Sequence, residues 1–415
     1  MKKRLLKISS TLIAAILFIA TLGVAAEAIE VYDPAMLAFD TADIQVQSPI
    51  VEEDISKREE NIKYFKHEDG SITAVTYGGP VHYKKEGLWL DIDNTLVQSA
   101  TRAGKTFFTN KANSLQVELP VQLEKDSAIS VTRDGYRLSW KAETQAAEKS
   151  AVLSKLPIKE ETSLTTEARL DEAVQAAKRN GALEAKKKKL SSSRTAARIA
   201  VEEQYARIAV ENEDRMTPKA LDSAVVYKGA LNSKTDLRYD LSGGTLKESI
   251  VLQSLPQERS YSFLMRADGM EASLQNDGSV VFAAEGQPIF VMASPYLIDA
   301  NGDTCVNVSV ALEEADGQWR YTLTPDRTWL EDEDRAWPVV LDPSVNADTS
   351  YITDTYVSSS NENSLDNQNK SNLQFGRNPT NGIQYQSYLK FINLPDIPEN
   401  SLIVDASLTM KLRCV

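Results

Sequence analysis

The chain has 415 residues, a formal net charge of −13 and two cysteines, Cys305 and Cys414. At about 100–200 residues per domain, this length predicts two or three domains. The acidic balance argues against a nucleic acid partner, because such binding depends on Lys and Arg meeting phosphates. Two widely spaced cysteines exclude the disulfide framework of a small secreted domain, although a single bridge between them remains open.

The N-terminus has the pattern of a secretory signal peptide. Four basic residues among the first seven precede an uncharged run, Thr11 to Ala26, and small residues follow at the expected cleavage point. We therefore predict a signal peptide over residues 1–28. An uncleaved anchor is the alternative, but a membrane span needs about 20 apolar residues and this run is shorter. The remaining chain is expected to be secreted, with no membrane contact after cleavage.

Residues 29–59 form an acidic leader with few aromatic side chains, for which a flexible segment is expected. From residue 60 onward, short β-branched and aromatic segments alternate with Asp-Gly, Gly-Gly and Glu-Gly pairs. Alternation with period two between turn dipeptides predicts strands and hairpins. We assign residues 60–345 to one large β domain.

A helical block interrupts this domain at about residues 161–220. It is rich in Ala, Glu, Lys and Arg, and apolar residues recur at helical spacing, as at Leu170, Val174 and Ala177. The pattern predicts amphipathic helices, interrupted at Asn180-Gly181 and at the serines 191–193. The lysine run 186–189 could form a polyanion-binding patch, but a solvated helix end is the favoured interpretation.

Strand and turn patterns resume near residue 223, with turns about ten to fifteen residues apart, as at Asp268-Gly269 and Asp277-Gly278. This spacing is typical of a sandwich or a long antiparallel array. The predicted fold class is therefore mainly β, with antiparallel sandwich-like domains and a helical insertion. An incomplete β-sandwich module is expected to follow over residues 346–415.

The sequence contains no recognisable catalytic motif. Its two histidines, His67 and His82, have no metal-ligand spacing, and no nucleophile elbow, P-loop or dinucleotide fingerprint occurs. His82 is interpreted as a packing or surface residue. We accordingly expect no enzyme activity, no catalytic residues and no cofactor.

One short segment has half of a calcium loop. Asp299, Asn301 and Asp303 occupy its first three ligand positions, but Thr304 and Val310 stand where the loop requires Gly and Glu. Asn301-Gly302 is also a common hairpin turn pair. A turn is favoured over a metal site here.

Aromatic side chains offer weak candidates for a binding site. Trp89, Trp319, Tyr385 and Tyr388 could stack on sugars, whereas strand aromatics more often serve the core or a cross-strand pair. No acid–base pair can be chosen for polysaccharide cleavage among so many carboxylates.

The C-terminal segment resembles the first part of a DNRLRE module, a β-sandwich domain of exported bacterial proteins. The resemblance rests on Asp354-Thr355-Tyr356, Leu373 to Gly376, Tyr388 to Phe391, Leu394-Pro395 and Ala406 to Met410. Upstream, residues 61–96 and 324–345 are similar to the N-terminal portion of wall-associated proteins with Rhs (YD) repeats, and the resemblance as a whole covers residues 60–160 and 220–412. The module here is cut short, and the helical block has no clear match in that family.

The resemblance implies a secreted, non-catalytic protein of the cell envelope. Its first predicted role is a presentation module that associates with the cell wall or an extracellular polysaccharide. The alternative is a structural leader or scaffold fragment of a larger exported protein, which could bear a toxin. A polysaccharide-acting enzyme is the least favoured hypothesis.

Overall fold

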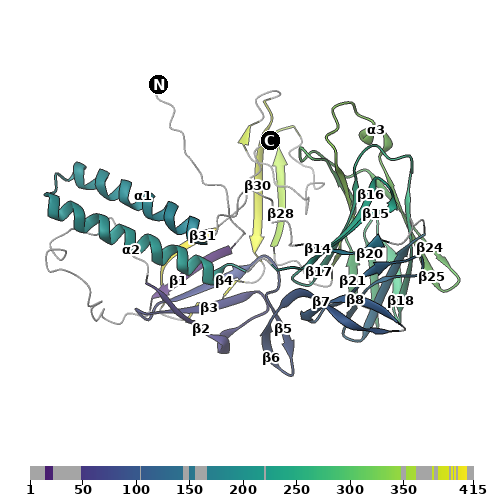
Figure 1. Ribbon diagram of the computed structural model, residues 1–415, viewed down its shortest axis with the longest axis horizontal. Helices are drawn as coiled ribbons and strands as arrows, with labels where there is room; N and C mark the ends of the chain where they lie inside the picture. Colours follow the sequence, from purple (N-terminus) through teal and green to yellow (C-terminus); the bar gives the residue numbers. More distant parts are fainter. Residues whose placement is uncertain are drawn as a thin grey trace. The chain divides into compact units, whose positions relative to one another are not determined.

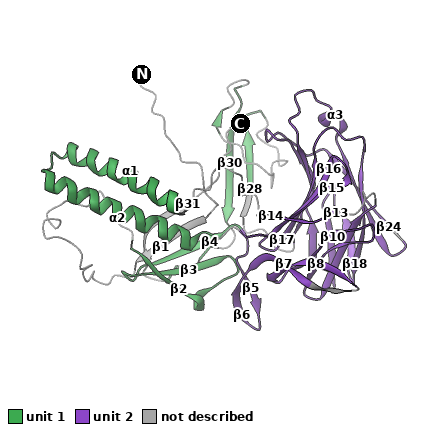
Figure 2. Ribbon diagram, in the orientation of Figure 1, with its two compact units in different colours: residues 1–78, 159–219, 352–412 green, residues 79–158, 220–351, 413–415 purple. Residues whose placement is uncertain are grey.

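The computed structural model describes residues 15–21, 48–102, 104–143, 149–154, 166–218, 221–346, 352–360, 376–377, 382–391, 394–395, 397–398 and 401–408. The chain divides into two compact units, shown in different colours in Figure 2. Unit 1 comprises residues 1–78, 159–219 and 352–412, and unit 2 comprises residues 79–158, 220–351 and 413–415. The expected cleavage point after Ala28 and most of the acidic leader lie outside the described residues, as does Cys414.

Unit 2 contains an antiparallel sheet of eight strands in the order β24-β25-β18-β12-β11-β9-β8-β7. Its strands are β7 (Asp93–Arg102), β8 (Lys105–Ala112), β9 (Gln116–Pro120), β11 (Ile129–Arg133), β12 (Tyr136–Ala142), β18 (Tyr261–Asp268), β24 (Val308–Ala315) and β25 (Gln318–Pro325). Asp134-Gly135 joins β11 to β12, and both residues have positive φ angles of 50° and 84°. Such a turn matches the twist of the two strands that it joins.

A second sheet of unit 2 has eleven strands, eight of them in the order β14-β15-β16-β17-β27-β21-β20-β19. These are β14 (Val152–Ser154), β15 (Ala224–Asn232), β16 (Thr235–Ser242), β17 (Thr245–Leu252), β19 (Glu271–Leu274), β20 (Val280–Ala284), β21 (Gln287–Met292) and β27 (Val345–Asn346). The other three, β22 (Tyr296–Ile298), β23 (Thr304–Cys305) and β26 (Val339–Asp342), branch from β17 through β26.

The two large sheets share one hydrophobic core. A single cluster of buried side chains includes Leu138 and Trp140 from the first sheet and Tyr239 and Leu241 from the second. The rings of Trp140 and Tyr239 lie 6.5 Å apart between their centroids, so the sheets are in contact there. Unit 2 is therefore an antiparallel β-sandwich, as the alternating pattern predicts.

Three smaller elements complete unit 2. Strands β5 (His82–Lys85) and β6 (Leu88–Asp91) form a separate hairpin, and β10 (Gln122–Leu123) pairs with β13 (Lys149–Ser150). The short helix α3 (Arg327–Leu330) begins at Asp326, whose carboxylate accepts hydrogen bonds from the amides of Thr328 and Trp329. This N-cap satisfies two amides that the first helical turn leaves without partners.

Unit 1 contains a five-stranded antiparallel sheet in the order β2-β3-β4-β1-β31. Its strands are β1 (Ala15–Thr21), β2 (Ile50–Glu53), β3 (Ile62–His67), β4 (Ile72–Tyr77) and β31 (Leu402–Leu408), and the 3-10 helix η2 (Ile55–Lys57) follows β2. A separate three-stranded sheet joins β28 (Ile352–Ser358), β30 (Gln384–Phe391) and β29 (Gly376–Arg377). Because β1 lies within the predicted signal peptide, removal of that peptide would remove this strand.

The helical insertion is an antiparallel hairpin of α1 (Thr166–Lys187) and α2 (Ser192–Met216), which lie side by side in Figure 1. Helix α1 continues through Asn180-Gly181, where an interruption was expected. A Cβ atom at Gly181 would lie 3.1 Å from both Cα and Cγ1 of Ile199, so glycine permits close packing of the two helices. The predicted mainly β fold with a helical insertion is confirmed.

The C-terminal part of α2 is attached to the sheet of unit 1. The side chain of Asn212 accepts a hydrogen bond from the amide of Ile50 and donates one to the carbonyl of Ser48, both at 2.9 Å. Arg215 donates to the carbonyl of Val51, and the hydroxyl of Tyr77 donates to the carbonyl of Met216. Among the described residues, neither this helix nor any other is long and apolar enough to cross a membrane.

Candidate functional site

The most unusual ionisable group of unit 2 is Glu248, at the centre of β17. Leu246, Glu248 and Ile250 alternate along this strand and face the sandwich core, and Glu248 is 1% exposed. A carboxyl group at an otherwise apolar core position is costly to bury unless hydrogen bonds compensate for the lost hydration.

Two aromatic side chains approach the Glu248 carboxyl. The hydroxyl of Tyr239 on β16 donates a 2.6 Å hydrogen bond to Oε1, and the indole N–H of Trp140 from the opposite sheet acts on the carboxyl more weakly, from beyond hydrogen-bond distance. Burial raises the pKa of Glu248 to about 7, although Tyr239 and Trp140 favour the ionised form. Asp342 adds a further small upward contribution to this pKa.

This arrangement is a protonation site within the core. The carboxyl is enclosed by the sandwich, so it does not present itself to a substrate as a general acid would. Its chemistry is therefore the uptake and release of one proton near neutral pH. Sequence analysis missed it, although Glu248 occupies the inward register of β17 and so breaks the apolar pattern of that face.

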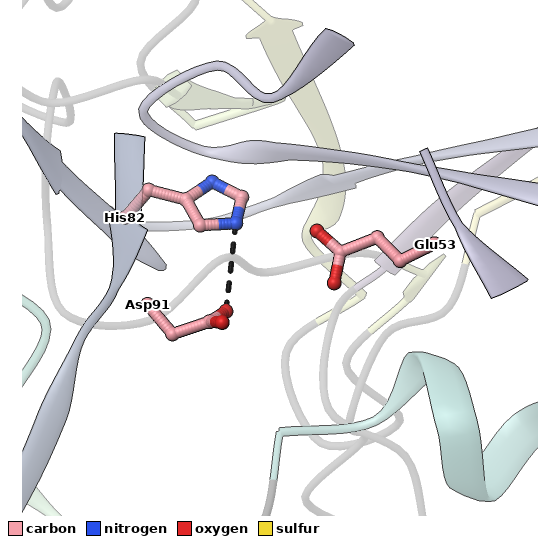
Figure 3. Close-up of side chains that lie close together, drawn as sticks. All are labelled: Glu53, His82 and Asp91. Atoms are coloured by element: carbon pink, nitrogen blue, oxygen red, sulfur yellow. Dashed lines mark ion pairs between the residues drawn. The ribbon is translucent and has the colours of Figure 1, made fainter. Parts of the chain in front are cut away.

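The hairpin β5–β6 brings together a histidine and a carboxylate. His82 is paired with Asp91 across the two strands, and His82 Nε2 lies 3.6 Å from Asp91 Oδ1 (Figure 3). The His82 side chain is buried, whereas that of Asp91 is about half exposed. A carboxylate beside an imidazole can orient the ring, which is the arrangement of a general base and its partner.

The third side chain drawn in Figure 3, Glu53, belongs to unit 1 and interacts with basic residues there. Its carboxylate forms an ion pair with Arg58 at 2.7 Å and lies 3.5 Å from Lys63. Within either unit taken by itself, the described residues bring together no three His, Cys, Asp or Glu side chains in metal-binding geometry.

The calcium-like segment forms a turn around a buried carboxylate. Asp299 Oδ1 accepts hydrogen bonds from the amides of Asn301 and Asp303, both at 2.9 Å, and Oδ2 lies 3.0 Å from Arg335 Nη1. Burial opposes ionisation, but the bonds from Asp303, Ala336 and Arg335 outweigh it and lower the pKa of Asp299. A guanidinium at this distance repels a cation, so the geometry supports the favoured turn, and a calcium site here stays a prediction.

The four aromatic candidates are divided between the two units. Trp89 lies on the β5–β6 hairpin with the Lys84 ammonium 5.5 Å from its ring centroid, and Trp319 packs against the sandwich core. Tyr385 and Tyr388 occupy opposite faces of β30, where Tyr385 contacts Tyr356 and Tyr388 is 55% exposed. Their assignment as binding residues remains untested.

Three curated proteins are similar to part of the chain. The tRNA3(Ser)-specific nuclease WapA of Bacillus spizizenii is 30% identical over 223 residues. The tRNA(Glu)-specific nuclease WapA of Bacillus subtilis subspecies natto and the tRNA nuclease WapA of Bacillus subtilis strain 168 are each 28% identical over 225 residues. Each match covers 48% of this chain but 9% of the relative. No protein-family model and no solved structure matches the chain.

These comparisons correct the predicted family and function. The assignment to DNRLRE-containing proteins is wrong, because no family model matches and the relatives found are named nucleases. Strand and turn patterns recur in unrelated sandwiches, so they were too unspecific to identify a family. The leading prediction of a carbohydrate-binding presentation module is wrong for the same reason, and the alternative of a toxin-bearing protein agrees better with the relatives.

The predictions of no enzyme and no nucleic acid partner are also contradicted, since the relatives are named for cleaving tRNA. The net charge of this chain does not predict the partners of the whole relatives, because the matched segment is a small part of each of them. The expected polysaccharide partner has no support from these proteins. The expected extracellular location agrees with the comparison.

Proposed function

We propose that this chain is a structural segment of a larger exported, cell-wall-associated toxin that cleaves tRNA. The observation that supports this proposal is the match of 48% of the chain to three tRNA nucleases, of which it covers 9%. The activity in those names is a property of the whole relative. In this proposal, residues 1–28 are removed on export, and the sandwich of unit 2 has a structural role in the extracellular protein.

Charge and packing favour a supporting role over direct tRNA cleavage by this segment. The chain has a net charge of −13, which opposes the approach of a polyanion. The core of unit 2 is filled by buried apolar side chains from both sheets. Among the described residues of this unit, His82 and Asp91 are the acid–base pair best suited to participate in cleavage.

An antibody against unit 2 tests the proposal. Culture medium and wall extract from the producing organism would be immunoprecipitated, and the captured protein incubated with unfractionated tRNA. We expect a captured protein with a mass well above the 45.9 kDa of this chain that cleaves tRNA. A captured protein of about the mass of the chain that leaves tRNA intact would overturn the proposal.

The purified 415-residue chain provides the second measurement. In the proposed arrangement it leaves tRNA intact under conditions in which the captured protein cleaves it. If the chain itself cleaves tRNA, a His82→Ala variant determines whether the His82–Asp91 pair participates. Loss of cleavage in that variant would replace the supporting role by a catalytic one.

A further inference from the structure

The turn between α1 and α2 presents a dense positive patch on an acidic protein. Seven of the 17 residues from Lys178 to Arg194 are Lys or Arg, and one is Glu. We define the basic tip as the exposed side chains of Lys178, Arg179, Lys186, Lys187, Lys188, Lys189 and Arg194. Lys187 pairs with Glu184 and Lys178 lies 3.7 Å from Glu203, but seven basic residues stand against one acidic residue in this segment. The patch therefore retains a strong net positive charge.

The basic tip is well ordered by the hydrogen bonds that end α1 and begin α2. The amide of Leu190 donates to the carbonyl of Ala185, and the amide of Lys189 donates to that of Lys186. These two bonds are the pair that defines a Schellman motif. Ser191 then caps α2 by accepting a hydrogen bond from the amide of Arg194. The positive charges are thus held on a defined turn between two helices.

Lys189 occupies a position at which another residue would stabilise the turn better. Its φ angle is 52°, in the left-handed region, at the site of a Schellman motif that glycine usually fills. A non-glycine residue in this conformation costs free energy. Lysine at this position therefore adds a positive charge but lowers the stability of the turn. This favours a binding role for lysines 186–189 over a role only in ending the helix.

The position of the tip in unit 1 suits contact with an extended surface. Asn212 fixes the other end of α2 to the β2 segment, and about 20 residues at 1.5 Å each place Ser192 about 30 Å further along the helix axis. In Figure 1 the turn lies at the end of the hairpin away from β2, β3 and β4. The charges are therefore concentrated at the outer end of this projection.

An exposed leucine distinguishes between possible anionic partners. Leu183 is 53% exposed and lies one helical turn before Lys186 and Lys187. An apolar side chain among lysines adds little affinity for a nucleic acid backbone. For a lipid surface, both residue types strengthen binding, because leucine enters the acyl boundary while the lysine ammonium groups remain at the anionic headgroups.

We propose that the basic tip of the α1–α2 hairpin binds the phosphate headgroups of an anionic membrane surface, with Leu183 inserted at the acyl boundary. The exported chain would meet such a surface from outside the cell. Lysines near an anionic bilayer each strengthen binding by on the order of 5-fold, and salt weakens the attraction. This interaction is independent of the proposed nuclease function.

Vesicle co-sedimentation with the exported form of the chain, without residues 1–28, tests the proposal. Vesicles of phosphatidylcholine containing phosphatidylglycerol should bind the chain, pure phosphatidylcholine vesicles should not, and added salt should release it. The quadruple variant Lys186→Gln, Lys187→Gln, Lys188→Gln, Lys189→Gln should lose about 10-fold or more of the affinity. The matched control replaces four exposed lysines of unit 2, Lys111, Lys125, Lys228 and Lys234, by Gln and should bind as the wild type does.

Two further measurements separate a lipid from another polyanion. Leu183→Gln should weaken vesicle binding while the helical circular dichroism stays unchanged. Unfractionated tRNA, titrated at the same salt concentration, should bind more weakly than the anionic vesicles. Tighter binding to tRNA, or equal loss of vesicle binding in the unit 2 control, would overturn the proposal.

Discussion

The hydroxyl of Tyr239 donates a 2.6 Å hydrogen bond to Oε1 of Glu248 inside the sandwich core. The two residues face each other from adjacent strands, because Tyr239 and Glu248 are register partners on β16 and β17. Desolvation raises the pKa of both groups, so Tyr239 stays protonated and donates while the carboxyl changes state. This pair therefore couples the stability of unit 2 to pH.

Glu248→Gln is expected to remove this coupling. The pKa of the carboxyl is about 7 in the folded chain and 4.5 for the exposed group. The folded state thus retains a proton that the unfolded state releases, and stability falls as pH rises from about 4.5 to 7. Gln cannot ionise, so the variant should be more stable than the wild type above pH 7 by up to about 3 kcal/mol and similar below pH 5.

Urea unfolding at pH 5 and pH 8 measures this difference. Glu271→Gln, at an exposed position of β19, is the control and should follow the wild-type profile. The charged neighbours Asp342 and Lys247 are unchanged in both variants, so the difference reports Glu248. Parallel pH profiles for wild type and Glu248→Gln would contradict a raised pKa.

Asp299→Asn is expected to destabilise unit 2. The Asp299 side chain is 0% exposed and pairs with Arg335, whose side chain is 6% exposed and lies 3.4 Å from the centroid of the Trp329 ring. Removing the carboxylate leaves the buried guanidinium with only the half-exposed Asp332 carboxylate, 3.7 Å away, and breaking a buried pair typically costs about 3–5 kcal/mol. The midpoint of chemical denaturation at neutral pH measures the loss.

Asp303→Asn is the matched control in the same turn, because the Asp303 side chain is exposed and contributes its backbone amide to Asp299. It should change stability by less than about 0.5 kcal/mol. The lowered pKa of Asp299 also means that its contribution disappears as pH falls through the acidic range. Equal destabilisation by the two variants would show that the buried pair is not the stabilising feature of the turn.

The sequence predicted the strands well because their alternation and turn residues are local signals. The segment Ser127 to Glu143, with Asp134-Gly135 at its centre, became β11 and β12. The His82–Asp91 pair could also have been found from the sequence. The turn Glu86-Gly87 fixes the register of the hairpin, which places these two residues opposite each other.

Contacts between residues far apart in the chain could not be predicted from the sequence. Asp299 and Arg335 are 36 positions apart, and nothing local indicates that a carboxylate in a turn pairs with that arginine. The continuity of α1 through Gly181 was missed for a similar reason. Local propensity disfavours glycine within a helix, but its contact with Ile199 depends on the packing of a second helix.

Asn212→Ala is expected to loosen the attachment of β2 to α2. The variant loses the acceptor for the Ile50 amide and the donor to the Ser48 carbonyl. Leaving a buried amide without a partner costs about 1–3 kcal/mol. Hydrogen exchange at Ile50 should therefore accelerate by roughly 10-fold or more. Asn180→Ala, at an exposed position of α1, should leave that amide unchanged, and unaltered exchange in Asn212→Ala would contradict the proposed attachment.

Gly181→Val is expected to destabilise the helical hairpin through steric overlap. The new Cβ would lie 3.1 Å from the backbone Cα of Ile199, and a backbone atom cannot move aside as a flexible side chain does. Overpacking of this kind typically costs about 1–3 kcal/mol.

Ala182→Val at the exposed neighbouring position introduces the same β-branched side chain without that contact, so it controls for helix propensity. Thermal denaturation followed by circular dichroism at the helical band should show a lower midpoint for Gly181→Val than for Ala182→Val. Equal midpoints would mean that α1 and α2 do not pack closely at Gly181.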